Sequence, residues 1–165
     1  MHITDGVVSL SEFTLPDAPI MSLADADPEH RGRFAFPATF VPSIEHSEEV
    51  IRRWQRETLA GERFTHAVRA ATTLDLLGGC ELRPLREGAA NVSYWTYPSH
   101  RSRGVASRAL ALLVKLAPDL YGFASLEAEI DPDNIASRKV VERNGFLLTA
   151  TRKENGRVVY ARQAP

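Results

Sequence analysis

The sequence has little cysteine, little lysine and no long apolar run. Its single cysteine, Cys80, excludes an internal disulfide and a cysteine-rich zinc site. No apolar stretch approaches the roughly 18 residues that a membrane-spanning helix needs, so we expect no membrane association. The first ten residues, MHITDGVVSL, do not pair a basic stretch with an apolar one. We therefore expect no secretory signal and a cytoplasmic location.

The overall composition shows no strong bias either. Hydrophobic residues make up 44% and charged residues 25% of the 165 residues, which is typical of globular proteins. These values exclude a disordered chain, a collagen-like chain and a coiled coil. A chain of this length fits a single domain, 1–165, whose core needs neither disulfides nor metal.

The net charge of -1 hides an uneven distribution of charge along the chain. Residues 1–60 hold five basic and ten acidic side chains, whereas residues 61–165 hold fifteen and eleven. The basic residues are seventeen arginines and three lysines. Arginine binds phosphate and carboxylate in a bidentate way, although genomic base composition explains the enrichment equally well. No basic stripe interleaves with aromatic residues, so we expect no nucleic-acid partner.

Hydrophobic periodicity and turn residues predict an alternation of strands and helices. Strands are predicted at 6–15, 64–73, 75–83, 90–97, 124–131, 146–152 and 157–163. Helices are predicted at 47–60, 104–117 and 134–144, with only short or broken helices in the proline-rich segment 16–46. The order is strand, helices, three strands, helix, strand, helix, two strands. It predicts an α/β (α+β) fold with a mixed sheet and helices on both faces.

Particular residues are expected to end these elements. Ser47 is a candidate cap for the helix at 47–60, and Gly61 ends it. Gly145 is a natural left-handed end for the helix at 134–144. The pair Asn155-Gly156 predicts a hairpin between the last two strands.

A basic loop joins the predicted strand at 90–97 to the predicted helix at 104–117. Arg101 and Arg103 supply positive charge. Gly104 lets an anion approach the backbone, and Ala106 keeps the first helical turn uncrowded. Because free N–H groups at a helix N-terminus bind anions, the loop is a candidate pyrophosphate cradle. It is neither a Walker loop nor a dinucleotide fingerprint, and a solvated basic surface is the alternative interpretation.

A second motif begins the predicted helix at 134–144. Asn134 and Ser137 share one helical face with Arg138 and Val141, by a spacing of three, four and seven residues. On its own, Asn134 is most simply a helix N-cap, and Ser137 is an ordinary serine of the first turn.

Together, the two motifs resemble the GNAT superfamily of acyl-CoA-dependent N-acyltransferases. The loop 101–106, which reads R-x-x-G-x-A, is similar to that family's pyrophosphate motif R/Q-x-x-G-x-G/A. The motif N-x-x-S at 134–137, continuing to Gly-Phe at 145–146, is similar to its later helix signature. The Tyr-Trp pair at 94–95 resembles the Tyr-Trp pair that precedes the loop in the RimJ/RimL-like branch. The resemblance is strong over 90–160 and weak over the first sixty residues.

The resemblance implies acetyl-CoA as co-substrate, a primary amine as acceptor, and no metal. It also implies that the strand before the loop splays from the strand after the long helix, leaving a gap for pantetheine. The residues expected to contact acetyl-CoA are Trp95, Thr96, Tyr97, Arg101, Ser102, Arg103, Gly104, Val105, Ala106, Ser107, Asn134 and Arg138.

The resemblance is incomplete at the catalytic positions. Many family members carry a tyrosine seven residues after the asparagine, where this sequence has Val141. In the RimJ/RimL-like branch the serine of N-x-x-S is the natural substitute, so Ser137 is the predicted donor to the leaving thiolate. The branch often has a glutamate where this sequence has Asn91.

The general base therefore stays open among Glu81, His66, Tyr94 and a water molecule. Glu81 is the catalytic candidate, and its alternative role is a structural ion pair with Arg83 or Arg69.

The acceptor is expected to lie against residues 16–60, where acidic side chains would suit a cationic amine. They are Asp25, Asp27, Glu29, Glu45, Glu48 and Glu49. The sequence does not choose among protein N-terminal α-amines, small amines, antibiotics and amino acids. Trp54, Phe34 and Phe36 are candidates for the core or for a subunit interface, which leaves a homodimer open.

Two other classes of function compete with acetyl transfer. The missing tyrosine and glutamate favour a non-catalytic acyl-CoA-binding module or sensor, which would bind acyl-CoA without turnover. A nucleic-acid binder is the third and weakest interpretation.

Overall fold

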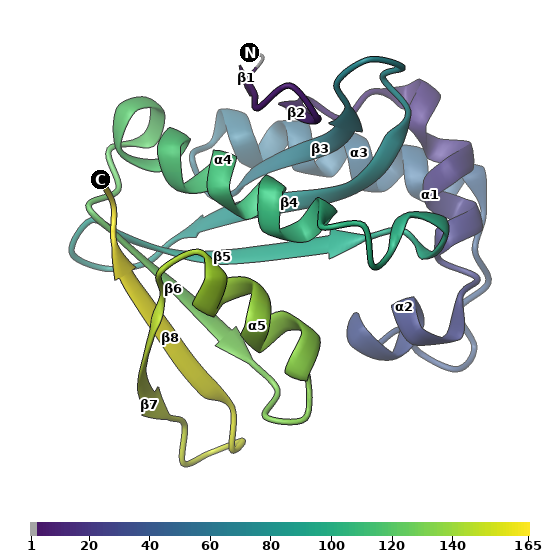
Figure 1. The fold of residues 1–165 in the computed structure, drawn as a ribbon. Helices are drawn as coiled ribbons and strands as arrows, with labels where there is room; N and C mark the ends of the chain where they lie inside the picture. Colours follow the sequence, from purple (N-terminus) through teal and green to yellow (C-terminus); the bar gives the residue numbers. More distant parts are fainter. Residues whose placement is uncertain (1–2) are drawn as a thin grey trace.

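The computed structural model describes residues 3–165 and forms one mixed sheet with helices on both faces (Figure 1). The strands are β1 (Ile3–Thr4), β2 (Val8–Ser11), β3 (Phe64–Ala70), β4 (Leu76–Pro84), β5 (Ala89–Thr96), β6 (Ser125–Ile130), β7 (Leu147–Thr151) and β8 (Val158–Gln163). The α-helices are α1 (Ala18–Ala24), α2 (Pro28–Arg33), α3 (Ile44–Leu59), α4 (Val105–Tyr121) and α5 (Ile135–Arg143). Short 3-10 helices span Leu15–Asp17 and Pro98–His100. The predicted fold class and element order are confirmed, with β1 as an additional short strand.

The strands lie in the order β1-β2-β3-β4-β5-β6-β8-β7. Neighbouring strands are antiparallel except β5 and β6, which run parallel. The helix α4 crosses from the end of β5 to the start of β6, as a parallel pair requires. This parallel junction lies in the middle of the sheet and borders a large cleft.

Each face of the sheet has its own core. On one face, α4 and α5 cover a large cluster that includes Leu10, Leu82, Leu113 and Val141. On the other face, α1 and α3 cover a smaller cluster built around Phe13, with Trp54 and Trp95 packed against it. Alternate residues of β5 therefore point to different layers.

Two helix boundaries differ from prediction. The helix α3 begins at Ile44, because the side chain of Ser43 accepts the N–H of His46 as the cap. The predicted cap, Ser47, is instead buried inside the helix. The helix α4 continues past the predicted end at residue 117 and through Pro118. The extra turn stacks Tyr121 on Phe64 with ring centroids 4.1 Å apart, which offsets the hydrogen bond that proline cannot donate.

The first strand is also shorter than the predicted 6–15, because a turn at Asp5 and Gly6 precedes it and a 3-10 helix begins at Leu15. Other boundaries agree more closely. Gly61 and Gly145 adopt positive φ after their helices, and β7 and β8 form the predicted hairpin around residues 152–157. Within residues 3–165, no helix is long and apolar enough to cross a membrane.

Candidate active site

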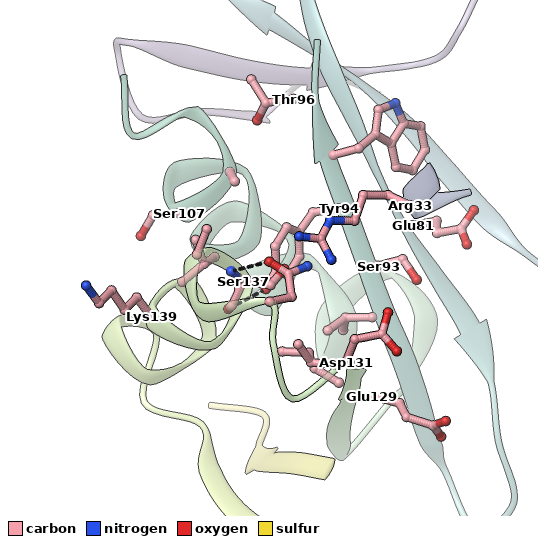
Figure 2. A pocket seen from close by; sticks show the side chains of 18 of the residues that line it. Arg33, Glu81, Ser93, Tyr94, Thr96, Ser107, Glu129, Asp131, Ser137 and Lys139 are labelled. Carbon is pink, nitrogen blue, oxygen red and sulfur yellow. Dashed lines mark hydrogen bonds between the residues drawn. The ribbon is translucent and has the colours of Figure 1, made fainter. Parts of the chain in front are cut away.

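The parallel strands β5 and β6 pair only at their beginnings. Ala89–Asn91 lie beside residues 125–127, after which the two strands separate. A cleft of about 1330 Å³ extends along this separation and is lined by β5, β6, α2 and the N-terminal parts of α4 and α5. Figure 2 shows Ser137 and Tyr94 near the middle of the cleft, with Thr96 and Asp131 farther along it. The splayed strands expected from the resemblance are present.

The N-terminus of α4 opens into the cleft. Its N-cap, Gly104, has φ 76°, and no side chain in the described residues caps this helix. Ser102 also adopts a positive φ of 61°. These turns leave the N–H groups of the first helical turn without intrahelical partners, at the positive end of the helix dipole. Ser102 and Gly104 line the cleft, together with Val105, Ala106 and Ser107. A pyrophosphate bound here would therefore be held mainly by backbone groups.

The two arginines of the loop have different surroundings. The guanidinium of Arg101 contacts Asp27 at 2.8 Å and Glu29 at 2.9 Å, which joins the loop to α2. The His30 N–H and Arg101 lower the pKa of Asp27, which also caps α2. Arg103 is exposed and does not line the cleft.

The start of α5 presents Ser137 to the cleft. The Ser137 N–H donates to Asn134 Oδ1 at 3.2 Å, so Asn134 is a helix N-cap as well as a lining residue. The Ser137 carbonyl accepts the Tyr94 hydroxyl at 2.9 Å. Both backbone groups of Ser137 are thus fixed, while none of the side-chain hydrogen bonds in residues 3–165 uses its Oγ. Ser137 is positioned at the cleft with its hydroxyl available.

Arg138 points to a different part of the molecule. Its Nε donates to the Tyr160 hydroxyl at 3.1 Å, and it does not line the cleft. Val141 is fully buried in the core, so of the four residues predicted to share a helix face only Asn134 and Ser137 line the cleft. The side chains of Lys139 and Arg143 line the cleft instead. Sequence spacing alone did not identify these two, because it did not show which helix face packs on the sheet.

The strand β5 presents its side chains to both layers. Thr96 and Trp95 line the cleft. Trp95 also packs in the cluster of the α1 and α3 face, where Tyr97 is buried and lines a smaller pocket rather than the cleft. The Tyr97 N–H donates to the Leu77 carbonyl at 2.8 Å, so this amide is already used within the sheet.

The candidate bases are separated by the fold. Glu81 is 4% exposed and contacts Arg83 at 2.8 Å and Arg63 at 3.7 Å. The predicted alternative partner, Arg69, pairs with Asp17 instead. Glu81 nevertheless lines both the cleft and the smaller pocket.

His66 lies outside the cleft, beside Tyr121, whose hydroxyl is 2.9 Å from its Nε2. Burial lowers the pKa of His66 to about 4. Burial also raises the pKa of Tyr94 to about 12. Of the three side chains considered as the base, only Glu81 is a carboxylate. It also lies where the two cavities meet.

Four of the six acidic side chains predicted to face the acceptor contact basic side chains. Asp25 contacts His30 at 3.3 Å, and Glu48 contacts Arg52 at 2.9 Å. Asp27 and Glu29 bind the arginine of the loop, as described above. The remaining members of the predicted set, Glu45 and Glu49, are exposed and line neither cavity. Acidic charge in this segment is therefore a weak guide to the acceptor.

A smaller pocket of about 240 Å³ lies on the α1 and α3 side of the sheet. Five residues line both this pocket and the cleft: His30, Phe34, Glu81, Arg83 and Trp95. The two cavities are therefore neighbours that meet at Trp95. No group of three or more metal-ligating side chains occurs within residues 3–165.

Comparisons with known proteins identify the family. A model of the acetyltransferase (GNAT) domain matches residues 8–147. The Bacillus subtilis (strain 168) protein named Probable N-acetyltransferase YjcK is 24% identical over 119 residues, which cover 70% of this chain. The match spans 66% of that relative, just under two thirds of its length.

Solved structures share the fold at low sequence identity. RimL, the ribosomal L7/L12 alpha-N-protein acetyltransferase in complex with coenzyme A, has a TM-score of 0.83 and 18% identity, covering 99% of this chain and 98% of its own. Mycobacterium smegmatis RimJ in complex with CoA-disulfide has a TM-score of 0.82 and 18% identity, covering 96% and 83%. The microcin C7 self immunity acetyltransferase MccE, in complex with acetyl-CoA and AMP, has a TM-score of 0.79 and 18% identity, covering 97% and 93%. With the family model matching residues 8–147 on this shared fold, the chain belongs to the GNAT acetyltransferase family.

Proposed function

We propose that the protein transfers an acetyl group from acetyl-CoA to a primary amine, either an N-terminal α-amine or the amine of a small molecule. The observation that carries the proposal is the uncapped N-terminus of α4, which opens into a large cleft beside two separating strands. Acetyl-CoA offers a pyrophosphate for the first feature and an extended pantetheine arm for the second. The thioester supplies the activated acetyl group.

The loop before α4 fits a pyrophosphate. Two residues of this loop, Ser102 and Gly104, adopt left-handed conformations, and both line the cleft. A Cβ built on Gly104 meets no protein atom within 4 Å, so the space beside it is open. Backbone N–H groups at a helix N-terminus bind anions without any charged side chain. In this proposal the peptide groups of residues 101–107 hold the pyrophosphate.

The remaining cofactor contacts come from the neighbouring elements. Beyond Asn91, the edge of β5 that faces β6 has no strand partner in the described structure. Its free backbone groups would pair with the amides of pantetheine along Val92–Thr96. Asn134 borders the same cleft, and Lys139 and Arg143 add positive charge to it.

Ser137 is the proposed hydrogen-bond donor to the leaving thiolate. Its backbone N–H and carbonyl are held by Asn134 and Tyr94, which fixes the position from which its side chain extends. A hydroxyl is a weak acid, so its contribution is stabilisation of developing negative charge rather than full proton transfer.

Glu81 is the proposed base, acting directly or through a water molecule. It lies at the junction of the two cavities, where an amine entering from the smaller pocket would meet the cleft. Arg83 and Arg63 hold its carboxylate in place. Most of the acceleration would come from alignment of the amine with the thioester.

The proposal is tested by binding and then by turnover. Acetyl-CoA at about 100 times its dissociation constant should stabilise the protein by roughly 2.7 kcal/mol, measured as a thermal shift. Release of free thiol from acetyl-CoA is then followed across a panel of amines. Binding with no turnover of any amine would favour an acyl-CoA sensor, and no thermal shift would overturn the proposal.

A matched pair of variants locates the cofactor site. Ala106→Glu places a carboxylate in the first turn of α4, where it suits the helix dipole but repels an anion. It should abolish the acetyl-CoA shift while the protein stays folded. Ala60→Glu makes the same change at an exposed residue after α3 and should leave the shift intact.

A further inference from the structure

The pocket of about 240 Å³ beside the cleft has an aromatic wall that is held in a fixed arrangement. Trp95 lies 5.9 Å from Trp54 and 5.6 Å from Phe34, measured between ring centroids. Met21, Val50, Phe36 and Tyr97 complete the apolar lining. The orientation of Trp95 is decided by the strand beside it. A Cβ built on Gly79 would lie 2.2 Å from the indole ring, so the ring occupies the space that a side chain would need.

The size of this pocket matches a single ring. A cavity of roughly 150 Å³ already accommodates benzene, whereas pockets for drug-sized ligands begin at about 300 Å³. A volume of 240 Å³ therefore suits one aromatic ring with a short linker. A long peptide segment or a polycyclic antibiotic would not fit inside it.

The charges around the pocket disfavour a second cation. Asp25 contacts His30 at 3.3 Å, and Glu81 is bound by Arg83 and Arg63. Both carboxylates that line the pocket therefore already have partners. A third arginine, Arg53, also lines the pocket, and Glu57 contacts Arg53 at 3.9 Å and Arg63 at 3.3 Å. A further ammonium group would therefore meet no unpaired carboxylate in the pocket lining, whereas a neutral ring would meet the aromatic wall.

We propose that the acceptor is a primary amine one or two carbons away from a neutral aromatic ring, and that the ring binds in this pocket. The proposal rests on the acetyl transfer proposed above and names its substrate class. Because the pocket meets the cleft at Trp95 and Glu81, a short linker would bring the amine to the junction while the ring stays against Trp54. A free arylalkylamine and a peptide with an N-terminal phenylalanine share this chemistry.

The first experiment measures turnover by thiol release from acetyl-CoA. We expect kcat/KM for 2-phenylethylamine to exceed that for ethylamine by about tenfold or more, as burial of one ring allows. Spermidine should be the poorest of the three. Tripeptides that begin with phenylalanine or serine then distinguish the two sources of the ring. A Phe-initiated peptide that is used better than 2-phenylethylamine points to protein N-termini, and the reverse points to a small molecule.

A matched pair of variants tests the location. Val50→Phe fills the pocket and should lower the preference for 2-phenylethylamine over ethylamine by about tenfold. Val7→Phe makes the same change at a residue that is 54% exposed in the turn before β2, and it should keep the preference. Thermal unfolding of both variants shows whether each is folded.

The second experiment does not depend on turnover. The chain has two tryptophans, Trp54 and Trp95, and both line the pocket, so intrinsic fluorescence reports its occupancy directly. We expect 2-phenylethylamine to change the emission of the CoA-bound protein, and spermidine to leave it unchanged. An unchanged emission with 2-phenylethylamine, or equal turnover of ethylamine, would overturn the inference and leave acetyl transfer standing. A fluorescence change with no turnover of any amine would overturn the acetyl transfer but support the ring site.

Discussion

Arg101 and Asp27 form an ion pair of 2.8 Å that connects the loop before α4 to the N-terminus of α2. Arg101 matches the arginine of the GNAT loop motif, yet its guanidinium is engaged by Asp27 and Glu29. The helix α2 begins a segment that contributes His30 and Phe34 to both cavities. The pair therefore links the loop before α4 to the segment that walls the smaller pocket.

Replacement of Arg101 by alanine should weaken binding of the amine more than binding of acetyl-CoA. Loss of two partly exposed ion pairs frees α2, at a cost of about 0.2–1 kcal/mol each. We expect a rise of a few-fold in KM for the amine, with a smaller change in the dissociation constant of acetyl-CoA. Arg103→Ala is the matched control, because Arg103 is exposed and lines neither cavity. A loss confined to acetyl-CoA affinity would show that Arg101 contacts the phosphates instead.

Ser137→Ala should slow acetyl transfer while acetyl-CoA binding survives. The substitution removes a hydroxyl that no side-chain hydrogen bond in residues 3–165 uses, so the fold should be little affected. We expect a decrease in kcat of about a hundredfold, the lower end of the range for loss of one transition-state hydrogen-bond donor. Ser125→Ala, on β6 and outside the cleft, is the control. Unchanged turnover would remove Ser137 from the mechanism.

Glu81→Gln should lower kcat and alter its dependence on pH, because an amide cannot take the proton of the amine. A decrease of about a hundredfold is the lower end of the range for a general base. The variant also leaves Arg83 without its carboxylate partner, so its unfolding must be measured alongside its rate. Glu45→Gln changes an exposed side chain that lines neither cavity. If the Glu81 variant stays folded with a normal rate and pH profile, the carboxylate is purely structural.

Gly79→Ala should destabilise the protein and disturb Trp95. The new methyl group would lie 2.2 Å from the indole ring, and overpacking of this kind typically costs about 1–3 kcal/mol. We expect an earlier midpoint in urea together with altered tryptophan fluorescence of the native state. Gly32→Ala is the matched substitution, since Gly32 lies in α2 with nothing within 4 Å of the added Cβ. It should be neutral or stabilising, as alanine favours helix.

Stability should fall in mild acid because of His66. Burial lowers its pKa from 6.5 to about 4, so the unfolded chain binds a proton that the folded protein does not. Its contribution is constant above about pH 6.5, decreases as the pH falls towards 4, and then levels off. The total loss is about 3 kcal/mol. His66→Gln should flatten this part of the curve when urea unfolding is measured between pH 7 and pH 4. Equal slopes for the variant and the natural sequence would contradict the assignment.

Local sequence signals predicted most of the fold, because they depend on neighbours within a few residues. The helix that ends at Gly145 and the strand with Leu126, Ala128 and Ile130 buried follow directly from turn chemistry and from a period of two. The start of α4 was predicted in the same way, since Gly104 sets it by its own left-handed conformation. The cap at Ser43 was missed because Ser47 offers the same chemistry one turn later.

The sequence by itself determined the family, the order of elements and the left-handed turn at Gly104 that begins α4. Those features depend on short motifs and on local conformational preference. Only the tertiary structure decided that Arg101 binds α2, that Arg138 turns to Tyr160, and that Trp95 faces the smaller pocket. These outcomes depend on which face of each element packs on the sheet and on partners far away in the sequence. No local pattern specifies such contacts, because they form only when the whole sheet brings the segments together.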